Sequence, residues 1–350
     1  MEIIPAVLSI ILITGVFLSL IRNDYWIYKI WEYPRLQKLT LVIIVIASWI
    51  IFWPPDNLFY KVIFWTLVAC LFYLLYKIWP YTVFFKKEML KAIPDAENEI
   101  KIFAANVLQD NKEYQNMLDQ VKEADPDLVY LVETNNDWAN AMKELEKDYP
   151  FKLLMPLENT YGLVFYSRLP LEDAHVKFLV KADIPSIEAI VTMRSGQKVK
   201  VWGVHPEPTV PGENLYSTAK DKELMKIALK AKEEKLPCMV FGDLNDVAWS
   251  HTTELFRKVS GLLDPRRGRG FYSTFSAHHW FVRSPLDYIF CSDHFGLIQM
   301  KRMPKNGSDH FATITHLVLC KEAREKQEAP RADHRELEEA KEKSVEKVKE

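Results

Sequence analysis

Six apolar runs in this chain each lead into a short polar fragment, and this recurrence limits the possible folds more than any other feature. The runs are rich in β-branched and aromatic residues, as buried strands are. Carboxylates, amides and imidazoles placed where strands end are what a divalent metal and a phosphoryl group require. We therefore expect one site made of Asn106, Glu133, His205, Asp243, Asn245, Asp287, Asp309 and His310.

The fragments differ in how strongly each one, taken alone, indicates a functional site. Glu133 ends a strongly apolar run. Because an unpaired carboxylate is unfavourable there, its position indicates a functional role. Asp243 and Asn245 are two residues apart at a strand end and project to the same side. Asp309 stands beside His310, which places an acid next to a proton carrier. Asn106 and His205 taken alone are equally consistent with a turn and a loop, so the prediction depends on the whole set.

Residues 100–320 alternate strand-like and helix-like segments, with much β content. Residues 113–124 and 218–235 are typical of helices, and the runs before the polar fragments are typical of strands. A segment of this length fits one mixed α/β domain.

In order and spacing, these motifs resemble those of the endonuclease/exonuclease/phosphatase superfamily, which has the DNase I-like fold. Residues 161–168 also resemble the strand that lies between the Glu and His motifs, whereas Ala312 stands where many members have proline. The resemblance implies a four-layer α/β sandwich of two packed sheets with helices outside and a metal site at one edge.

The resemblance also implies roles. Glu133 is the principal ligand of Mg²⁺ (or Mn²⁺), with Asn106 beside it and Asp309 supporting this ion or a second one. His310, oriented by Asp287, acts as the base or stabilises the phosphoryl group, and Asp243 orients or deprotonates the attacking water. Asn245 and His205 hydrogen-bond the phosphoryl oxygens. The sequence leaves open whether Asp243 or His310 takes the proton.

Residues 1–85 are apolar and aromatic, and we predict a membrane anchor of three transmembrane helices at about 3–21, 38–54 and 58–79. The second run is short, so a buried or interfacial helix pair is the alternative. Residues 86–99 are predicted to be a linker. The protein is thus expected to be a multi-pass protein of the cell membrane.

The side of the membrane on which the domain lies stays open. Basic residues between the first two runs and after the third place the domain in the cytoplasm by the positive-inside rule. The order of three spans and then this domain resembles the teicoplanin-resistance membrane proteins of actinobacteria. That resemblance implies an outward-facing domain acting on a polyprenyl (pyro)phosphate.

Two charged segments are predicted as well. Arg266, Arg267 and Arg269 form a glycine-flanked basic loop that could hold an anionic substrate or could simply be solvated. Residues 321–350 alternate acids and bases, which is typical of a solvated helix or a disordered tail.

We expect a phosphatase or phosphodiesterase that acts on a lipid-linked phosphate, with the lipid bilayer as its partner. The net charge of −2 gives no nucleic-acid signature, so a membrane-tethered nuclease is less favoured. A non-catalytic scaffold would not need both Glu133 and His310. No protein partner can be inferred.

Overall fold

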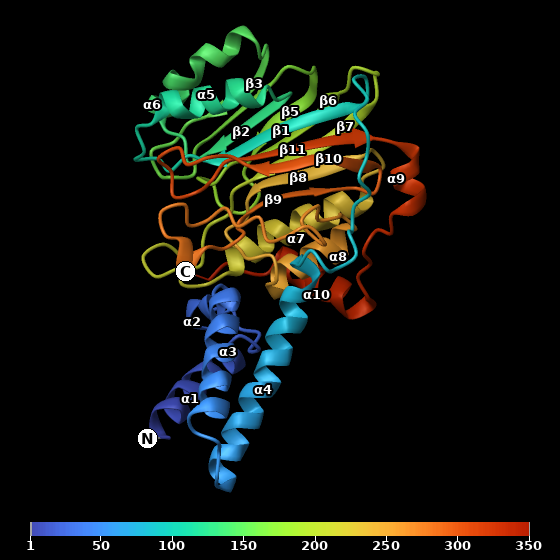
Figure 1. Ribbon diagram of the computed structural model, residues 1–350. Coiled ribbons are helices and arrows are strands. Elements are labelled where there is room, and N and C mark those ends of the chain that lie inside the picture. Colours follow the sequence, from blue (N-terminus) through green and yellow to red (C-terminus); the bar gives the residue numbers. More distant parts are fainter. Residues whose placement is uncertain (1, 350) are drawn as a thin grey trace.

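Two β-sheets pack face to face in the computed structural model, which describes residues 2–349 (Figure 1). One sheet has the strand order β10-β11-β1-β2-β4-β3 and the other β5-β6-β7-β8-β9. The strands are β1 (Glu99–Asn106), β2 (Leu128–Val132), β3 (Phe151–Met155), β4 (Leu163–Ser167), β5 (Leu171–Lys177), β6 (Ser186–Thr192), β7 (Lys198–Val204), β8 (Cys238–Asp243), β9 (Asp287–Cys291), β10 (Phe295–Arg302) and β11 (Thr313–Leu319).

Helices cover the outer face of each sheet. Helices α5 (Tyr114–Ala124) and α6 (Asn136–Ala141) pack on the six-stranded sheet, and α7 (Thr218–Glu233) and α8 (His251–Ser260) pack on the five-stranded sheet (Figure 1). Alternation along the strands supplies both faces: in β2, Leu128 and Tyr130 point between the sheets, and Val129 and Leu131 point towards α5. The predicted α/β sandwich is confirmed.

Strand pairing brings the polar fragments to one edge. Strand β1 is parallel to β2, with Asn106 opposite Val132, so Glu133 follows directly beside Asn106. Strand β7 is parallel to β8, and β9 runs antiparallel to β8 with Asp287 opposite Asp243. Each sheet therefore contributes polar side chains to the same edge of the sandwich.

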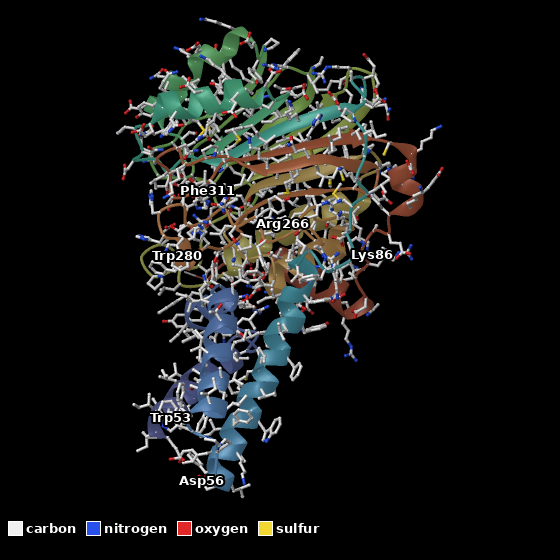
Figure 2. The ribbon with its side chains drawn as sticks, in the orientation of Figure 1. Trp53, Asp56, Lys86, Arg266, Trp280 and Phe311 are labelled. Carbon is white, nitrogen blue, oxygen red and sulfur yellow. The ribbon has the colours of Figure 1, made fainter. Side chains whose placement is uncertain are left out.

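The N-terminal helices project from the domain as a bundle (Figures 1 and 2). They are α1 (Ile3–Leu18), α3 (Arg35–Ile51) and α4 (Leu58–Ile78), and the short elements α2 (Trp26–Lys29) and η1 (Ile30–Glu32) precede α3. The helices pack together around Trp49 and Leu67, and Trp49 Nε1 donates a hydrogen bond to Ser9 Oγ of α1 (3.0 Å).

The prediction of three membrane spans needs correction. Among residues 2–349, only Leu58–Tyr81 is by itself long and apolar enough to cross a membrane. A second span exists only if Trp26–Glu32 and Arg35–Ile51, bent by 68°, count as one. Helix α1 has 16 residues and so is about 24 Å long, short of the roughly 30 Å hydrocarbon core. Because α1 is shorter than the hydrocarbon core of a bilayer, it does not count as a third separate span.

The segment predicted to be a linker, residues 86–99, is packed against the domain. Met89 is buried in the core between the sheets, and Glu88 pairs with Arg257 of α8 at 2.6 Å. Lys91 also forms a β-bridge with Leu297. The connection between the bundle and the sandwich is therefore held in place by the domain.

The charged C-terminal segment is helical and packs on the domain. Helix α9 (Lys321–Lys326) is followed by α10 (His334–Val345), which starts with a capping box between Asp333 and Glu336. Ala340 of α10 is fully buried against α7 and α8. The small side chain of Ala340 thus lets the strongly charged α10 pack closely on α7 and α8, which cover the five-stranded sheet.

Candidate metal-dependent active site

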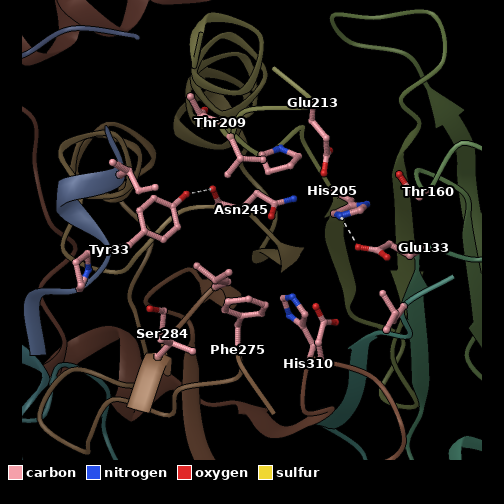
Figure 3. A pocket seen from close by; sticks show the side chains of 18 of the residues that line it. Tyr33, Glu133, Thr160, His205, Thr209, Glu213, Asn245, Phe275, Ser284 and His310 are labelled. Carbon is pink, nitrogen blue, oxygen red and sulfur yellow. Dashed lines mark hydrogen bonds and ion pairs between the residues drawn. The ribbon is translucent and has the colours of Figure 1, made fainter. Parts of the chain in front are cut away.

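The predicted residues surround one pocket of about 590 Å³ at the edge where the two sheets meet (Figure 3). Glu133, His205, Asn245, Asp309 and His310 line its polar end. Asn106, Asp243 and Asp287 are buried next to these residues. All eight side chains that the sequence singled out therefore lie together, although their motifs span more than 200 positions of the chain.

Asn106 links the two sheets through its amide. Its Nδ2 atom donates to Glu133 Oε1 at 2.6 Å and to Asp243 Oδ2 at 3.1 Å. Glu133 has φ = 60°, a left-handed conformation that a glutamate adopts only where its surroundings impose it. Burial raises the pKa of Glu133 above its ordinary value, and the amide of Asn106 opposes the rise.

His310 is held between two carboxylates. Its Nδ1 atom lies 2.8 Å from Asp287 Oδ2, and its Nε2 atom lies 3.6 Å from Asp243 Oδ2. Burial alone would lower the pKa of His310, but Asp287 and Asp243 outweigh it and raise the pKa to about 10. Burial also raises the pKa of Asp243, while the His310 cation opposes the rise. The pair favours a charged imidazolium beside a carboxylate.

His205 lies beside Glu133 and Asp243 and is 2% exposed. The Nε2 atom of His205 is 4.0 Å from both Glu133 Oε1 and Asp243 Oδ2 (Figure 3). The centres of the Tyr161 and His205 rings are 5.6 Å apart. Burial lowers the pKa of His205 to about 3, so the ring is neutral. Its Nδ1 atom is buried and makes no hydrogen bond within residues 2–349. The other nitrogen, Nε2, is the one beside the two carboxylates, and a neutral ring can hydrogen-bond a ligand through it.

The turn after β8 requires its glycine. Gly242 has φ = 132°, and a Cβ atom added there would lie 2.1 Å from the carbonyl oxygen of Val204. Asn245 also has a positive φ of 50°, and its backbone N–H donates to Asp243 Oδ1 at 2.9 Å. The Asn245 side chain donates to the carbonyl oxygen of Pro206 at 3.0 Å. The Gly-Asp-x-Asn fragment is thus a rigid turn that connects the loops after β7 and β8.

The donor set fits a divalent cation. The Asn106 amide lies between the carboxylates of Glu133 and Asp243. Rotating it by 180° would present its oxygen to the same place but would give up the hydrogen bond that this oxygen accepts from the Leu108 N–H at 3.0 Å. Asp243, Asp287 and His310 also offer one ligand atom each within 4.8 Å of one another. Asp287 and His310 already hydrogen-bond each other at 2.8 Å, however. Glu133 and Asp243 add carboxylate oxygens on either side of Asn106, and hard cations prefer oxygen donors.

The arginines predicted to bind substrate lie elsewhere. The guanidinium of Arg266 is 1% exposed and pairs with Asp264 at 2.7 Å. Arg267 pairs with Glu254, and Arg269 donates to the backbone carbonyl oxygens of Pro265 and Met89. None of the three lines the pocket. The structure thus does not bring these three side chains to the pocket, because neighbouring acids and carbonyl groups satisfy the basic loop internally.

The sequence did not reveal the contribution of the N-terminal segment to this pocket. Tyr33 lies beyond the predicted first span, yet its hydroxyl donates to the carbonyl oxygen of Asn245 at 2.7 Å (Figure 3). Ile30, Pro34 and Gln37 line the same pocket. The interruption of the apolar pattern around Tyr33 and Pro34 was the only local signal, and it does not identify a partner 212 positions away.

The fold and the site together define a class of protein, the metal-dependent phosphoester hydrolases. Residues 102–310 match the model of the endonuclease/exonuclease/phosphatase family, and the match covers more than half of the chain. The protein therefore belongs to this family. No curated protein matches the chain.

Solved structures share the fold at low sequence identity. The human nocturnin catalytic domain with bound sulfate is 16% identical, with a TM-score of 0.52 over 65% of this chain and 97% of that one. Humanized TDP2 of D. rerio is 15% identical, with a TM-score of 0.52 over 63% of this chain and 98% of that one. A family protein of Bacteroides thetaiotaomicron is 16% identical, with a TM-score of 0.51 over 64% and 96%. These likenesses confirm the fold.

Proposed function

We propose that this protein is a membrane-anchored, Mg²⁺-dependent phosphatase or phosphodiesterase that acts on a lipid-linked phosphate at the bilayer surface. One observation carries the proposal: the pocket that contains the hydrolase residues is closed on one side by the segment between the first two apolar helices. Tyr33 of that segment donates a hydrogen bond to the backbone of Asn245. A site built in this way lies where the helical bundle meets the domain.

The surface of the bundle supports membrane anchoring. Large apolar side chains on all three helices are exposed, and soluble monomers rarely expose such a continuous apolar surface. Among them are Ile10, Ile11, Phe17, Ile43, Ile44, Ile50, Phe59, Val62, Trp65 and Phe72. We infer that this bundle lies in the membrane with Leu58–Tyr81 as its span. Residues 100–320 are then the catalytic domain.

The roles we propose follow from the geometry. Glu133, Asn106 and Asp309 hold the cation, which when bound neutralises charge on the phosphate and on the leaving oxygen. His205, beside Glu133, and Asn245, after β8, orient the phosphoryl oxygens.

Asp243 and His310 handle the proton. Because Asp287 and Asp243 both favour the charged imidazolium, His310 donates to the phosphoryl group, and Asp243 accepts the proton of the attacking water. Asp287 fixes the orientation of the imidazole ring through the Nδ1 contact.

The substrate class follows from the pocket and from the anchor together. A polyprenyl pyrophosphate, the substrate that the resemblance to teicoplanin-resistance membrane proteins implies, has a headgroup for the polar end and a chain for the bilayer. A nuclease is the competing function, since TDP2 of D. rerio has been solved with a single-stranded DNA product. The net charge of −2 and the apolar wall of the pocket favour the lipid.

A substrate panel tests the proposal. Purified full-length protein in micelles with Mg²⁺ would be given polyprenyl pyrophosphate, a phosphoinositide, sphingomyelin and plasmid DNA. We expect hydrolysis of at least one lipid, a loss of at least about 100-fold in Glu133→Gln and no change in Glu172→Gln, an exposed glutamate on β5. Hydrolysis of DNA alone contradicts the lipid assignment. If Glu133→Gln equals the wild type on every substrate, the site assignment is wrong.

A further inference from the structure

The pocket changes character from one end to the other. At the polar end stand the metal and phosphate residues described above, and at the other end stand Ile30, Tyr33, Pro34, Val282 and Leu286. Phe275 lies at the boundary, with its ring 5.1 Å from that of His310. A headgroup at the polar end would therefore have apolar surface directly beside it.

Two separate parts of the chain make the apolar end. Ile30, Tyr33 and Pro34 come from the N-terminal segment, and Val282 and Leu286 come from the loop before β9. Gln37 at the start of α3 joins them, because its Nε2 atom donates to the carbonyl oxygen of Phe281 at 2.9 Å. The wall is therefore complete only when the membrane anchor and the domain are in contact.

The apolar end is continuous with the surface that we place in the bilayer. Ile30 and Val282 are 40% and 41% exposed although they line the pocket, so the wall opens outward between them. Beside Val282, Phe281 and Trp280 are also exposed, and Trp280 lies at the edge of the domain that faces the bundle (Figure 2). A chain that leaves the pocket here enters the bilayer without crossing water.

We propose that this apolar end is the subsite for the hydrocarbon chain of the substrate, and that the membrane anchor determines chain specificity by supplying half of it. The inference rests on the proposed lipid phosphatase function and adds where the chain lies and which residues select it. The pocket volume of about 590 Å³ suits a phosphate headgroup and the first part of one chain. Ile30 and Val282 are the specificity residues.

Matched variants of the full-length protein test this subsite. Ile30→Asn is compared with Ile27→Asn, because Ile27 is in the same segment and 43% exposed but does not line the pocket. The readout is the ratio of kcat/KM for polyprenyl pyrophosphate in vesicles to kcat/KM for water-soluble isopentenyl pyrophosphate. We expect Ile30→Asn to lower this ratio about tenfold, as loss of one apolar contact does. Ile27→Asn should keep the ratio of the wild type.

The outcomes separate the two proposals. If the wild type hydrolyses polyprenyl pyrophosphate and Ile30→Asn keeps the full preference for it, or Ile27→Asn loses as much, the subsite is wrong and the proposed function stands. If the wild type hydrolyses neither pyrophosphate, both are overturned for this substrate class.

A second measurement does not depend on variants. A polyprenyl pyrophosphate with a photoreactive group on its first isoprene unit should label peptides that contain residues 30–37 and 275–286. Label confined to the outer surfaces of α1 and α4 overturns the subsite.

Discussion

Asp221 of α7 joins the N-terminal segment, the C-terminal helix and the domain. Its buried carboxylate lies 2.9 Å from Lys343 Nζ of α10 and 3.7 Å from Lys29 Nζ of the N-terminal segment. It also accepts hydrogen bonds from Thr252 Oγ1 of α8 at 3.0 Å and from Ser217 Oγ at 3.2 Å. Four parts of the chain therefore depend on one negative charge.

We expect Asp221→Asn to lower the free energy of unfolding by about 3–5 kcal/mol, because the change leaves the largely buried Lys29 without its counter-charge and Lys343 with Asp24, at 3.4 Å, as its remaining acidic partner. The control is Asp137→Asn. Asp137 pairs with Lys112 at 3.7 Å, but both side chains are about two-thirds exposed, so this change should cost less than about 1 kcal/mol. The assay is urea unfolding of the full-length protein in micelles, followed by tryptophan fluorescence.

The pKa of Asp221 also predicts how the stability difference between the wild type and Asp221→Asn depends on pH. Burial alone would raise the pKa of Asp221, but the cations of Lys29 and Lys343 outweigh it and hold the pKa well below its ordinary value. The stability from this group is therefore complete above the unfolded pKa of about 3.9 and is lost as pH falls below it. The gap between wild type and Asp221→Asn should narrow below about pH 4. A gap under about 1 kcal/mol at pH 7, or one that does not change with pH, refutes the reasoning.

Three further predictions concern other positions. Burial raises the pKa of Glu223 to about 8, so the folded state keeps a proton that the unfolded state releases, and stability falls as pH rises from about 4.5 to 8. Glu223→Gln should remove this slope and unfold at a higher temperature than the wild type at pH 8.5; an equal slope contradicts the assignment. Tyr33→Phe removes the hydrogen bond to the Asn245 carbonyl and should lower kcat about 3–10-fold with Tm nearly unchanged. An unchanged kcat would show that this hydrogen bond does not contribute to catalysis. Gly242→Ala forces a Cβ atom against the Val204 carbonyl and should lower stability by at least about 2 kcal/mol in thermal unfolding, and a neutral result would disprove the close approach.

The local sequence pattern was enough to predict a mixed α/β domain and to single out the residues that now lie together, whereas the two-sheet sandwich was implied by the resemblance of the motifs to a known family. Four of the six fragments stand at or just after the end of a strand, so period-two alternation marks the strand and the first polar residue marks its end. Asp287 instead begins β9, and Asp309–His310 precede β11. The parallel pairs β1–β2 and β7–β8 then bring Asn106 next to Glu133, and His205 next to Asp243. This part of the site depends on strand ends and needs no knowledge of long-range packing.

The rest depended on contacts that no local pattern encodes. Tyr33 and Lys29 belong to a segment whose composition indicates only a connection between apolar helices, yet they contact residues about 200 positions away. The tail was expected to be solvated because it lacks large apolar residues, but Ala340 and Lys343 dock it through a small contact and a buried ion pair. The basic loop was expected either to hold an anionic substrate or to be solvated, and the local pattern did not reveal that Arg266 pairs with Asp264, two residues earlier.

The most direct test of the account is the rate of phosphate release from polyprenyl pyrophosphate in vesicles, measured against Mg²⁺ concentration after chelation. The account predicts no release without the metal, saturable recovery on adding Mg²⁺, and loss of at least about 100-fold at saturating Mg²⁺ in Glu133→Gln but not in Glu172→Gln. Release that persists in the chelated protein, or that is equal in the wild type and Glu133→Gln, would contradict it.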